Sequence, residues 1–97
     1  MALKTTPFDA AAHIQTAEDV AHFLEAAFEG HDAAHIANAL GVVARSRGMA
    51  ALAEQTGLNR TTLYKALSSD GNPSLETLLK VMDVLGLRLT VKAPEVA

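Results

Sequence analysis

The chain has 97 residues, of which 49% are apolar, and a formal net charge of −3 at pH 7. This length is typical of one domain, and the apolar content excludes a disordered chain. Because the sequence contains no cysteine, disulfides, thiolate metal ligands and a thiol nucleophile are excluded. No apolar run reaches the roughly 18 residues that span a bilayer, and the first residues lack a secretory pattern, so we expect a cytoplasmic protein.

Charge is distributed unevenly along the chain. Residues 1–44 carry one basic and six acidic side chains, whereas residues 45–97 carry seven basic and five acidic ones. We therefore divide the chain into an acidic N-terminal helical extension, residues 1–44, and a more basic core, residues 45–97, within one compact domain. This asymmetry favours two partners, one of them a basic protein. The alternative is that the acidic side chains simply solvate helix faces.

The first half of the chain predicts helices separated by glycine. After a short helical turn at residues 8–14, Thr16 is expected to cap a helix that ends near Glu29, before Gly30. Its apolar spacing predicts one buried face, made of Val20, Phe23, Leu24, Ala27 and Phe28. Asp32 is expected to cap a second helix, near residues 33–47, that buries Ile36, Leu40 and Val43 and ends at Gly48.

The most informative stretch follows, at residues 49–67. It predicts two short helices, near residues 49–56 and 60–67, joined by a tight turn at Gly57. The residues expected to face inward are Leu52, Ala53, Leu58, Leu63, Ala66 and Leu67. The second helix, capped by Asn59, presents Arg60, Thr61, Thr62, Tyr64 and Lys65 to solvent. A polar, basic helix that apolar residues hold against the core can enter the major groove of DNA. The pattern therefore predicts sequence-specific DNA binding.

The last third predicts a loop, a helix and a strand. Residues 68–73 form a loop by composition, and Ser74 begins a helix with an apolar face of Leu75, Leu78, Leu79, Met82 and Leu85. Gly86 ends that helix, and apolar and polar residues then alternate over residues 87–92, which predicts a short strand. A strand needs a partner. The candidates are a second copy, residues 2–6, or another protein's sheet; the alternative is a loosely attached tail.

Residues 49–89 resemble the helix-turn-helix domain of the Cro and phage-repressor type, through Ala53, Gly57, Leu58 and Leu63 and the stretch from Gly71 onward. Nearly the full chain resembles HigA-like addiction-module antidote proteins of bacteria. The segments that carry this second resemblance are residues 8–9, 18–29, 46–50, 63–68 and 70–73. One departure is Met49, which stands where that type of repressor often has a polar residue such as Gln.

The resemblance, together with the periodicity, implies an all-α fold of five to six short helices, with a lambda-repressor-like helix-turn-helix core and one C-terminal β-strand. It also implies an antitoxin of a type II module. Such a protein neutralises a small basic toxin of the RelE/HigB type and represses its own operon. We expect a homodimer that reads palindromic double-stranded DNA, with half-sites about one helical turn apart.

Candidate site residues follow from these patterns. Arg60, Thr61 and Lys65 are expected to read bases, with Arg60 suited to guanine and Thr61 to a thymine methyl. Phosphate contacts are assigned to Asn59, Thr62, Tyr64, Ser68, Asn72 and Arg47, although capping, turn formation or packing explains several of these equally well. The toxin is expected to contact the acidic side chains of Glu18, Glu25 and Glu29, and, by strand addition, Arg88 and Thr90.

Other functions fit less well. A stand-alone phage-type repressor and a protein-interaction module without DNA binding remain as alternatives. An enzyme is disfavoured because the sequence shows neither a catalytic nucleophile paired with a general base nor a glycine-rich loop that binds phosphate. His31 and His35 are four residues apart, but His31 precedes the helix and no third ligand is evident, so we expect neither a metal nor a cofactor.

Overall fold

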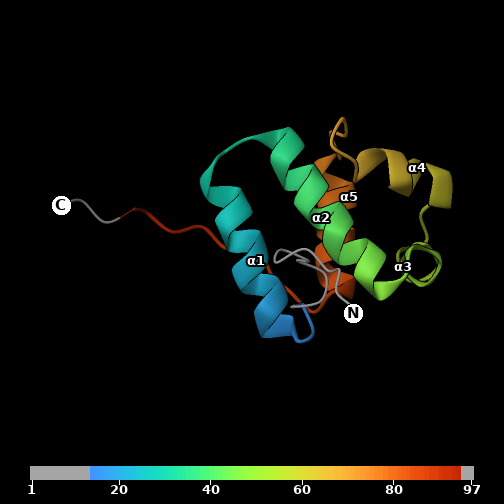
Figure 1. Cartoon of the computed structure of the whole chain (residues 1–97), viewed down its shortest axis with the longest axis horizontal. Coiled ribbons are helices and arrows are strands. Elements are labelled where there is room, and N and C mark those ends of the chain that lie inside the picture. The colour runs from blue at the N-terminus through green and yellow to red at the C-terminus, as the bar shows by residue number, and fades with distance from the viewer. Residues whose placement is uncertain (1–13, 95–97) are drawn as a thin grey trace, which may run out of the picture.

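Five α-helices follow one another in the computed structural model, which describes residues 14–94 (Figure 1). Their bounds are α1 (Ala17–Glu29), α2 (Ala33–Arg47), α3 (Met49–Thr56), α4 (Arg60–Ala66) and α5 (Leu75–Val84). The predicted order and bounds of these helices are confirmed to within one residue. Most of the helical turn expected at residues 8–14 lies outside the described residues. None of the helices in residues 14–94 combines the length and apolar character needed to cross a bilayer.

Each of the predicted capping residues starts its helix with a side-chain hydrogen bond. The Asp19 N–H donates to Thr16 Oγ1 (3.0 Å), and the Thr16 N–H donates back to Asp19 Oδ2 (3.2 Å), which completes a capping box. The three other caps are Asp32 for α2, Asn59 for α4 and Ser74 for α5. These bonds satisfy N–H groups that lack partners inside the helix, so the local sequence determines where each helix begins.

The core is centred on α2, whose Leu40 and Val43 are fully buried. α2 packs against α1 on one side and α3 on another, and α5 packs against α3. Gly41 lies where α2 passes the end of α4, because a Cβ at this position would overlap the Leu67 carbonyl oxygen. The boundary between the acidic N-terminal part and the more basic part of the chain, after residue 44, falls inside α2. Buried residues from both parts belong to the same core.

The turn between α3 and α4 is made by Gly57, which adopts a left-handed backbone with φ of 77°. Its N–H donates to the Ala53 carbonyl (2.9 Å) and so ends α3. Glycine is favoured here because a Cβ is strained in this conformation. Leu63 and Leu67, both fully buried, then hold α4 on the core.

The predicted C-terminal strand is not formed. Residues 87–94, which we call the C-terminal segment, contain no strand, and neither does any other described part of the chain. Leu87 and Leu89 are half-buried and pack on the core, as the alternation predicted, but no second extended segment among residues 14–94 lies beside them. A β-strand forms only when its backbone pairs with another strand. Alternation of apolar and polar residues, without such a partner, therefore leaves an extended tail.

The predicted buried face of α5 is also only partly right. Met82 and Leu85 are buried, but Leu75 and Leu79 are exposed by 66% and 46%. The apolar stripe of α5 is therefore wider than this chain covers. Val81, which the predicted stripe omitted, is fully buried instead.

Candidate functional site

The exposed surface of α4 carries five of the nine residues that the sequence assigned to DNA. Arg60, Thr61, Thr62, Tyr64 and Lys65 are all exposed; we call them the α4 face. Leu63, which lies between them in the sequence, is fully buried. One side of α4 is therefore packed on the core, and the opposite side faces solvent. No acidic residue occurs between Glu54 and Asp70, which leaves the α4 face with a positive charge.

Within the α4 face, Arg60 lies over the ring of Tyr64, with its guanidinium carbon 5.8 Å from the ring centroid. The pair stands four residues apart on one helix, which is the spacing that brings side chains together. A guanidinium at this distance is attracted by the ring's negative face. The sequence suggested either DNA contact or core packing for Tyr64. In the structure its side chain is 42% exposed and its ring lies beneath Arg60.

The residues assigned to phosphate contacts divide into two groups. Asn59 Oδ1 accepts from the Thr62 N–H (3.1 Å) and Ser68 Oγ donates to the Lys65 carbonyl (3.0 Å), so both already serve the ends of α4. Asn72 and Arg47 are exposed without such bonds. Met49, at the start of α3, is buried, and its side chain belongs to the core.

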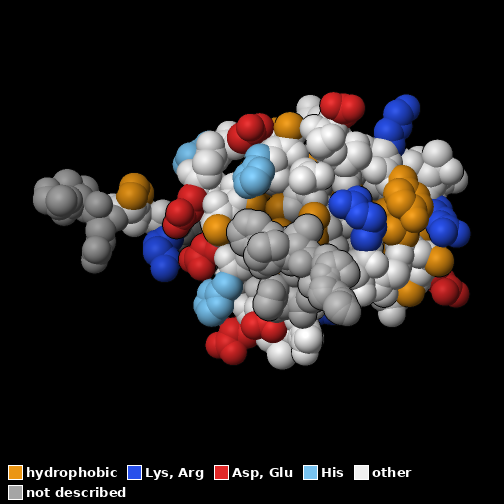
Figure 2. Space-filling model, in the orientation of Figure 1, with side chains coloured by type: hydrophobic (Ala, Val, Ile, Leu, Met, Phe, Trp, Pro, Cys, Tyr) orange, Lys and Arg blue, Asp and Glu red, His pale blue; other side chains and the backbone are white. Residues whose placement is uncertain are grey.

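Charged side chains are separated across the molecule. Acidic side chains gather mostly toward the end with α1, and basic ones mostly toward the end with α4 (Figure 2). Among residues 14–94 a single ion pair forms, between Glu76 and Lys80 on α5 (3.4 Å). Neither Arg60 nor Lys65 is therefore paired with a carboxylate in the described part of the chain.

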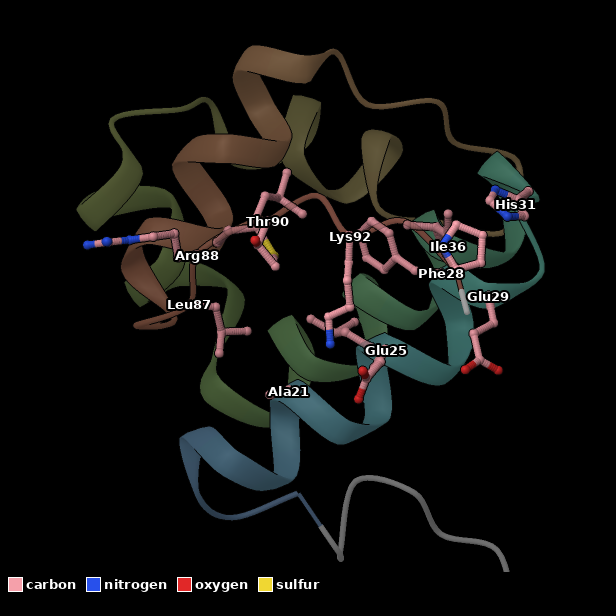
Figure 3. A pocket seen from close by; sticks show the side chains of 14 residues that line it. Ala21, Glu25, Phe28, Glu29, His31, Ile36, Leu87, Arg88, Thr90 and Lys92 are labelled. Carbon is pink, nitrogen blue, oxygen red and sulfur yellow. The ribbon is translucent and has the colours of Figure 1, made fainter. Parts of the chain in front are cut away.

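A groove of about 700 Å³ lies between α1 and the C-terminal segment (Figure 3). Its lining includes four of the five residues expected to contact a protein partner, namely Glu25, Glu29, Arg88 and Thr90. Glu18 is exposed in the first turn of α1 and does not line the groove. The floor is apolar and includes Leu24, Phe28, Ile36, Met82, Leu87 and Leu89. The fold thus joins two segments that are about 60 residues apart in the sequence.

Sequence reasoning missed two features of these surfaces. Lys92 lines the groove and extends toward the side where Glu25 lies, whereas Arg88 points away (Figure 3). Gly41 fixes how closely α2 approaches the end of α4. A glycine in the middle of an otherwise alanine-rich helix is the signal that could have indicated this close approach.

The carboxyl group of Asp19 has a perturbed pKa, and the cause is its role in the capping box at the start of α1 rather than a binding or catalytic site. The backbone N–H groups of Gln15 and Thr16 donate to its carboxylate and lower its pKa below the ordinary value. His31 precedes α2, with φ of 55°, and residues 14–94 contain no cluster of three or more His, Asp or Glu side chains arranged around a metal.

The sequence is similar to known proteins over almost its whole length. Residues 4–93 match the family described as "Probable addiction module antidote protein". A relative from Haemophilus influenzae, described as an uncharacterized protein, is 39% identical over 85 residues, which cover 88% of each chain. No solved structure matches the chain.

The family match runs from before α1 to residue 93, and therefore includes the α4 face and all of the groove's lining except Pro94. An antidote family implies a toxin as partner and indicates a regulatory protein rather than an enzyme. This chain belongs to the family of probable addiction module antidote proteins.

Proposed function

We propose that this protein is an antitoxin that neutralises a small basic toxin of the RelE/HigB type and represses its own operon by binding palindromic DNA. The observation that carries the DNA-binding part is the α4 face, a basic and hydroxyl-rich surface on a helix that buried leucines hold in place. The toxin-binding part rests on family membership and on the acidic side chains of α1.

On the α4 face, Arg60 and Thr61 stand at the start of the helix and Lys65 one turn later. This is where a recognition helix meets base edges in the major groove. Arg60 offers two parallel N–H groups to guanine O6 and N7, Thr61 a methyl contact to thymine, and Lys65 a charge for guanine or phosphate. Thr62, Tyr64, Asn72 and Arg47 supply the surrounding phosphate contacts, which set register without reading sequence. Asn59 and Ser68 contribute by holding the helix ends, and phosphate contact from them is secondary.

Two copies of this narrow face are needed for useful affinity. The exposed Leu75 and Leu79 on α5 form an apolar stripe that a second copy of the chain fits, since a two-fold axis brings identical stripes together. We place the two α5 helices antiparallel in this dimer, so that Glu76 of each copy faces Lys80 of the other. Within one chain these two side chains pair with each other (3.4 Å). The dimer then presents two α4 faces to one palindrome.

The test of DNA binding uses the duplex upstream of the protein's own gene and a shuffled duplex of equal length. Arg60→Ala is expected to reduce the preference for the upstream duplex over the shuffled one by about 1–3 kcal/mol, which is the contribution of one bidentate base contact. Arg88→Ala, which removes an exposed base of the C-terminal segment and lies outside the α4 face, is the matched control and should keep the preference. Unchanged discrimination in Arg60→Ala, with the fold intact by circular dichroism, overturns the assignment of the α4 face.

The test of the antitoxin part uses the product of the gene adjacent to this chain's own, which the proposed function expects to be a small basic protein. Co-expression should yield a stable complex and relieve the growth arrest that this partner causes alone. Failure to form a complex leaves a stand-alone repressor as the better description.

A further inference from the structure

The C-terminal segment offers an unpaired backbone edge. Leu87 and Leu89 attach its beginning to the core, directly after the turn at Gly86 that follows α5. From residue 88 to residue 94, no backbone N–H or carbonyl forms a hydrogen bond with any described residue. An anchored, extended stretch with free donors and acceptors is a template for pairing with another strand.

The side chains of this segment show that its apolar face continues past the surface that the chain itself covers. Residues two apart in an extended chain share a face, so Val91 belongs with Leu87 and Leu89. Leu87 and Leu89 are half-buried, but Val91 is 98% exposed. A β-branched apolar side chain of this kind is typical of a strand interior, so the segment lacks a covering partner from Val91 onward.

The opposite wall of the groove supplies charge. Glu25 and Glu29 lie four residues apart on α1, both exposed and neither in an ion pair within residues 14–94. Between this acidic wall and the C-terminal segment lies the apolar floor, which includes Leu24, Phe28 and Met82. A strand placed in the groove therefore meets backbone on one edge, apolar surface beneath and carboxylates on the other side.

Building on the proposed antitoxin function, we infer that the C-terminal segment captures the toxin by strand addition, with residues 88–92 pairing with a free strand edge of a basic partner. Backbone hydrogen bonds supply affinity in this mode, and side-chain contacts supply specificity. Lys or Arg side chains of the added strand reach Glu25 and Glu29. Arg88 does not oppose them, because it points away from the groove, whereas Lys92 of this chain itself extends toward the side where Glu25 lies (Figure 3).

A second copy of the chain is a poorer occupant. Two C-terminal segments paired with each other form a two-stranded ribbon without further layers, which is marginally stable in water. A basic protein with an exposed sheet edge satisfies the backbone and the carboxylates together.

The test is residue-resolved amide hydrogen exchange by NMR on the full chain, alone and in complex with the product of the adjacent gene, which the proposed function expects to be a small basic protein. In the chain alone, the amides of residues 88–92 should exchange rapidly. In the complex, alternate amides in this stretch should slow by about 100-fold or more, because a strand pairs every second residue along one edge. The Glu25→Gln and Glu29→Gln double variant should weaken the complex about fivefold or more, since each removes an ion pair. Glu54→Gln, an exposed acid on α3, is the matched control.

The outcomes separate this inference from the proposed function. A complex that forms while the amides of residues 88–92 stay fast overturns strand addition but leaves the antitoxin function standing. Absence of any complex overturns both. If the amides of residues 88–92 exchange slowly in the chain alone, and more slowly as its concentration rises, the C-terminal segment pairs with a second copy. That result also overturns the inference.

Discussion

The α4 face and the C-terminal segment lie at opposite ends of the molecule (Figure 1) and differ in how completely this chain builds them. α4 is capped by Asn59, ended by a bond to Leu63 and held by two fully buried leucines. The C-terminal segment has half-buried anchors at its start, then a free backbone edge and an almost fully exposed valine. One surface is complete before its partner arrives, whereas the other acquires its structure from the partner.

The largest effect should come from breaking the close approach that positions α4. In Gly41→Ala the new Cβ overlaps the Leu67 carbonyl oxygen, so the end of α4 must shift. Overpacking costs about 1–3 kcal/mol, which exceeds the roughly 1 kcal/mol that alanine gains over glycine inside a helix. We expect a lower free energy of unfolding in urea and weaker DNA binding, with no change at the C-terminal segment.

Gly30→Ala is the matched control for that variant. Gly30 has an ordinary right-handed backbone, and the nearest atom to an added Cβ is the Ala27 carbonyl oxygen at 3.8 Å. This variant should therefore be as stable as the wild type or slightly more so. Equal destabilisation by both substitutions would contradict the assigned role of Gly41.

A smaller effect is expected when the start of α4 is weakened. Asn59→Ala removes the acceptor of the Thr62 N–H, a loss of about 1 kcal/mol at a helix cap. The free energy of unfolding should fall by this amount, and amides in the first turn of α4 should exchange faster. Asn59→Asp, which keeps an acceptor, should retain most of the stability but weaken DNA binding by placing a negative charge beside the phosphates. If Asn59→Asp bound DNA as tightly as the wild type, that end of α4 would not face DNA.

These local features are the ones that the sequence could predict. Each cap, the glycine turn and the bounds of the helices depend on neighbouring residues, so a pattern of a few positions suffices. The approach of Gly41 to Leu67 could not be predicted, because it depends on how α2 and α4 pack. Leu75 and Leu79 were predicted to be buried and residues 87–92 to form a strand, and both predictions were wrong. The reason is that an apolar or alternating pattern does not reveal whether its partner belongs to the same chain.

The groove shows the same limit. Glu25 and Arg88 were both assigned to a protein partner from separate arguments, one from charge and the other from alternation. Only the packing of the C-terminal segment beside α1 places them on one surface. Sequence patterns therefore identified most of the groove's polar residues, but not that they form a single site.

Tyr64 should contribute a smaller effect, on binding rather than on stability. Its ring holds the Arg60 guanidinium, and an exposed contact of this type contributes about 0.5–1 kcal/mol. Tyr64→Ala should lower the preference for the upstream duplex severalfold, whereas Tyr64→Phe, which keeps the ring, should restore it. If Tyr64→Phe is as weak as Tyr64→Ala, the phenol hydroxyl contacts DNA directly and the ring does not position Arg60. Tyr64 is the only tyrosine in the chain, so 3-fluorotyrosine gives one fluorine signal that should shift on DNA binding.

The smallest effect concerns the pH dependence of α1, the helix that borders the groove. Backbone N–H groups of Gln15 and Thr16 lower the pKa of Asp19 below its ordinary value of 3.8. A carboxyl group whose pKa is lower in the folded state stabilises the fold above its unfolded pKa, and that contribution disappears as the pH falls through the folded pKa. The stability difference between wild type and Asp19→Asn should therefore be constant above about pH 5 and shrink below about pH 4.

Urea unfolding across this pH range measures that difference, with Glu18→Gln as the control. Glu18 is an exposed carboxylate in the same first turn, but it forms no hydrogen bond to backbone within residues 14–94, so its removal should change stability less. Amide exchange adds the comparison between the two ends of the molecule. If acid loosens the amides of α1 while those of α4 stay protected, the groove end opens separately from the α4 face. If both change together, α1 and α4 unfold as one cooperative unit, and a toxin bound at the groove would stabilise the DNA-binding end through that unit.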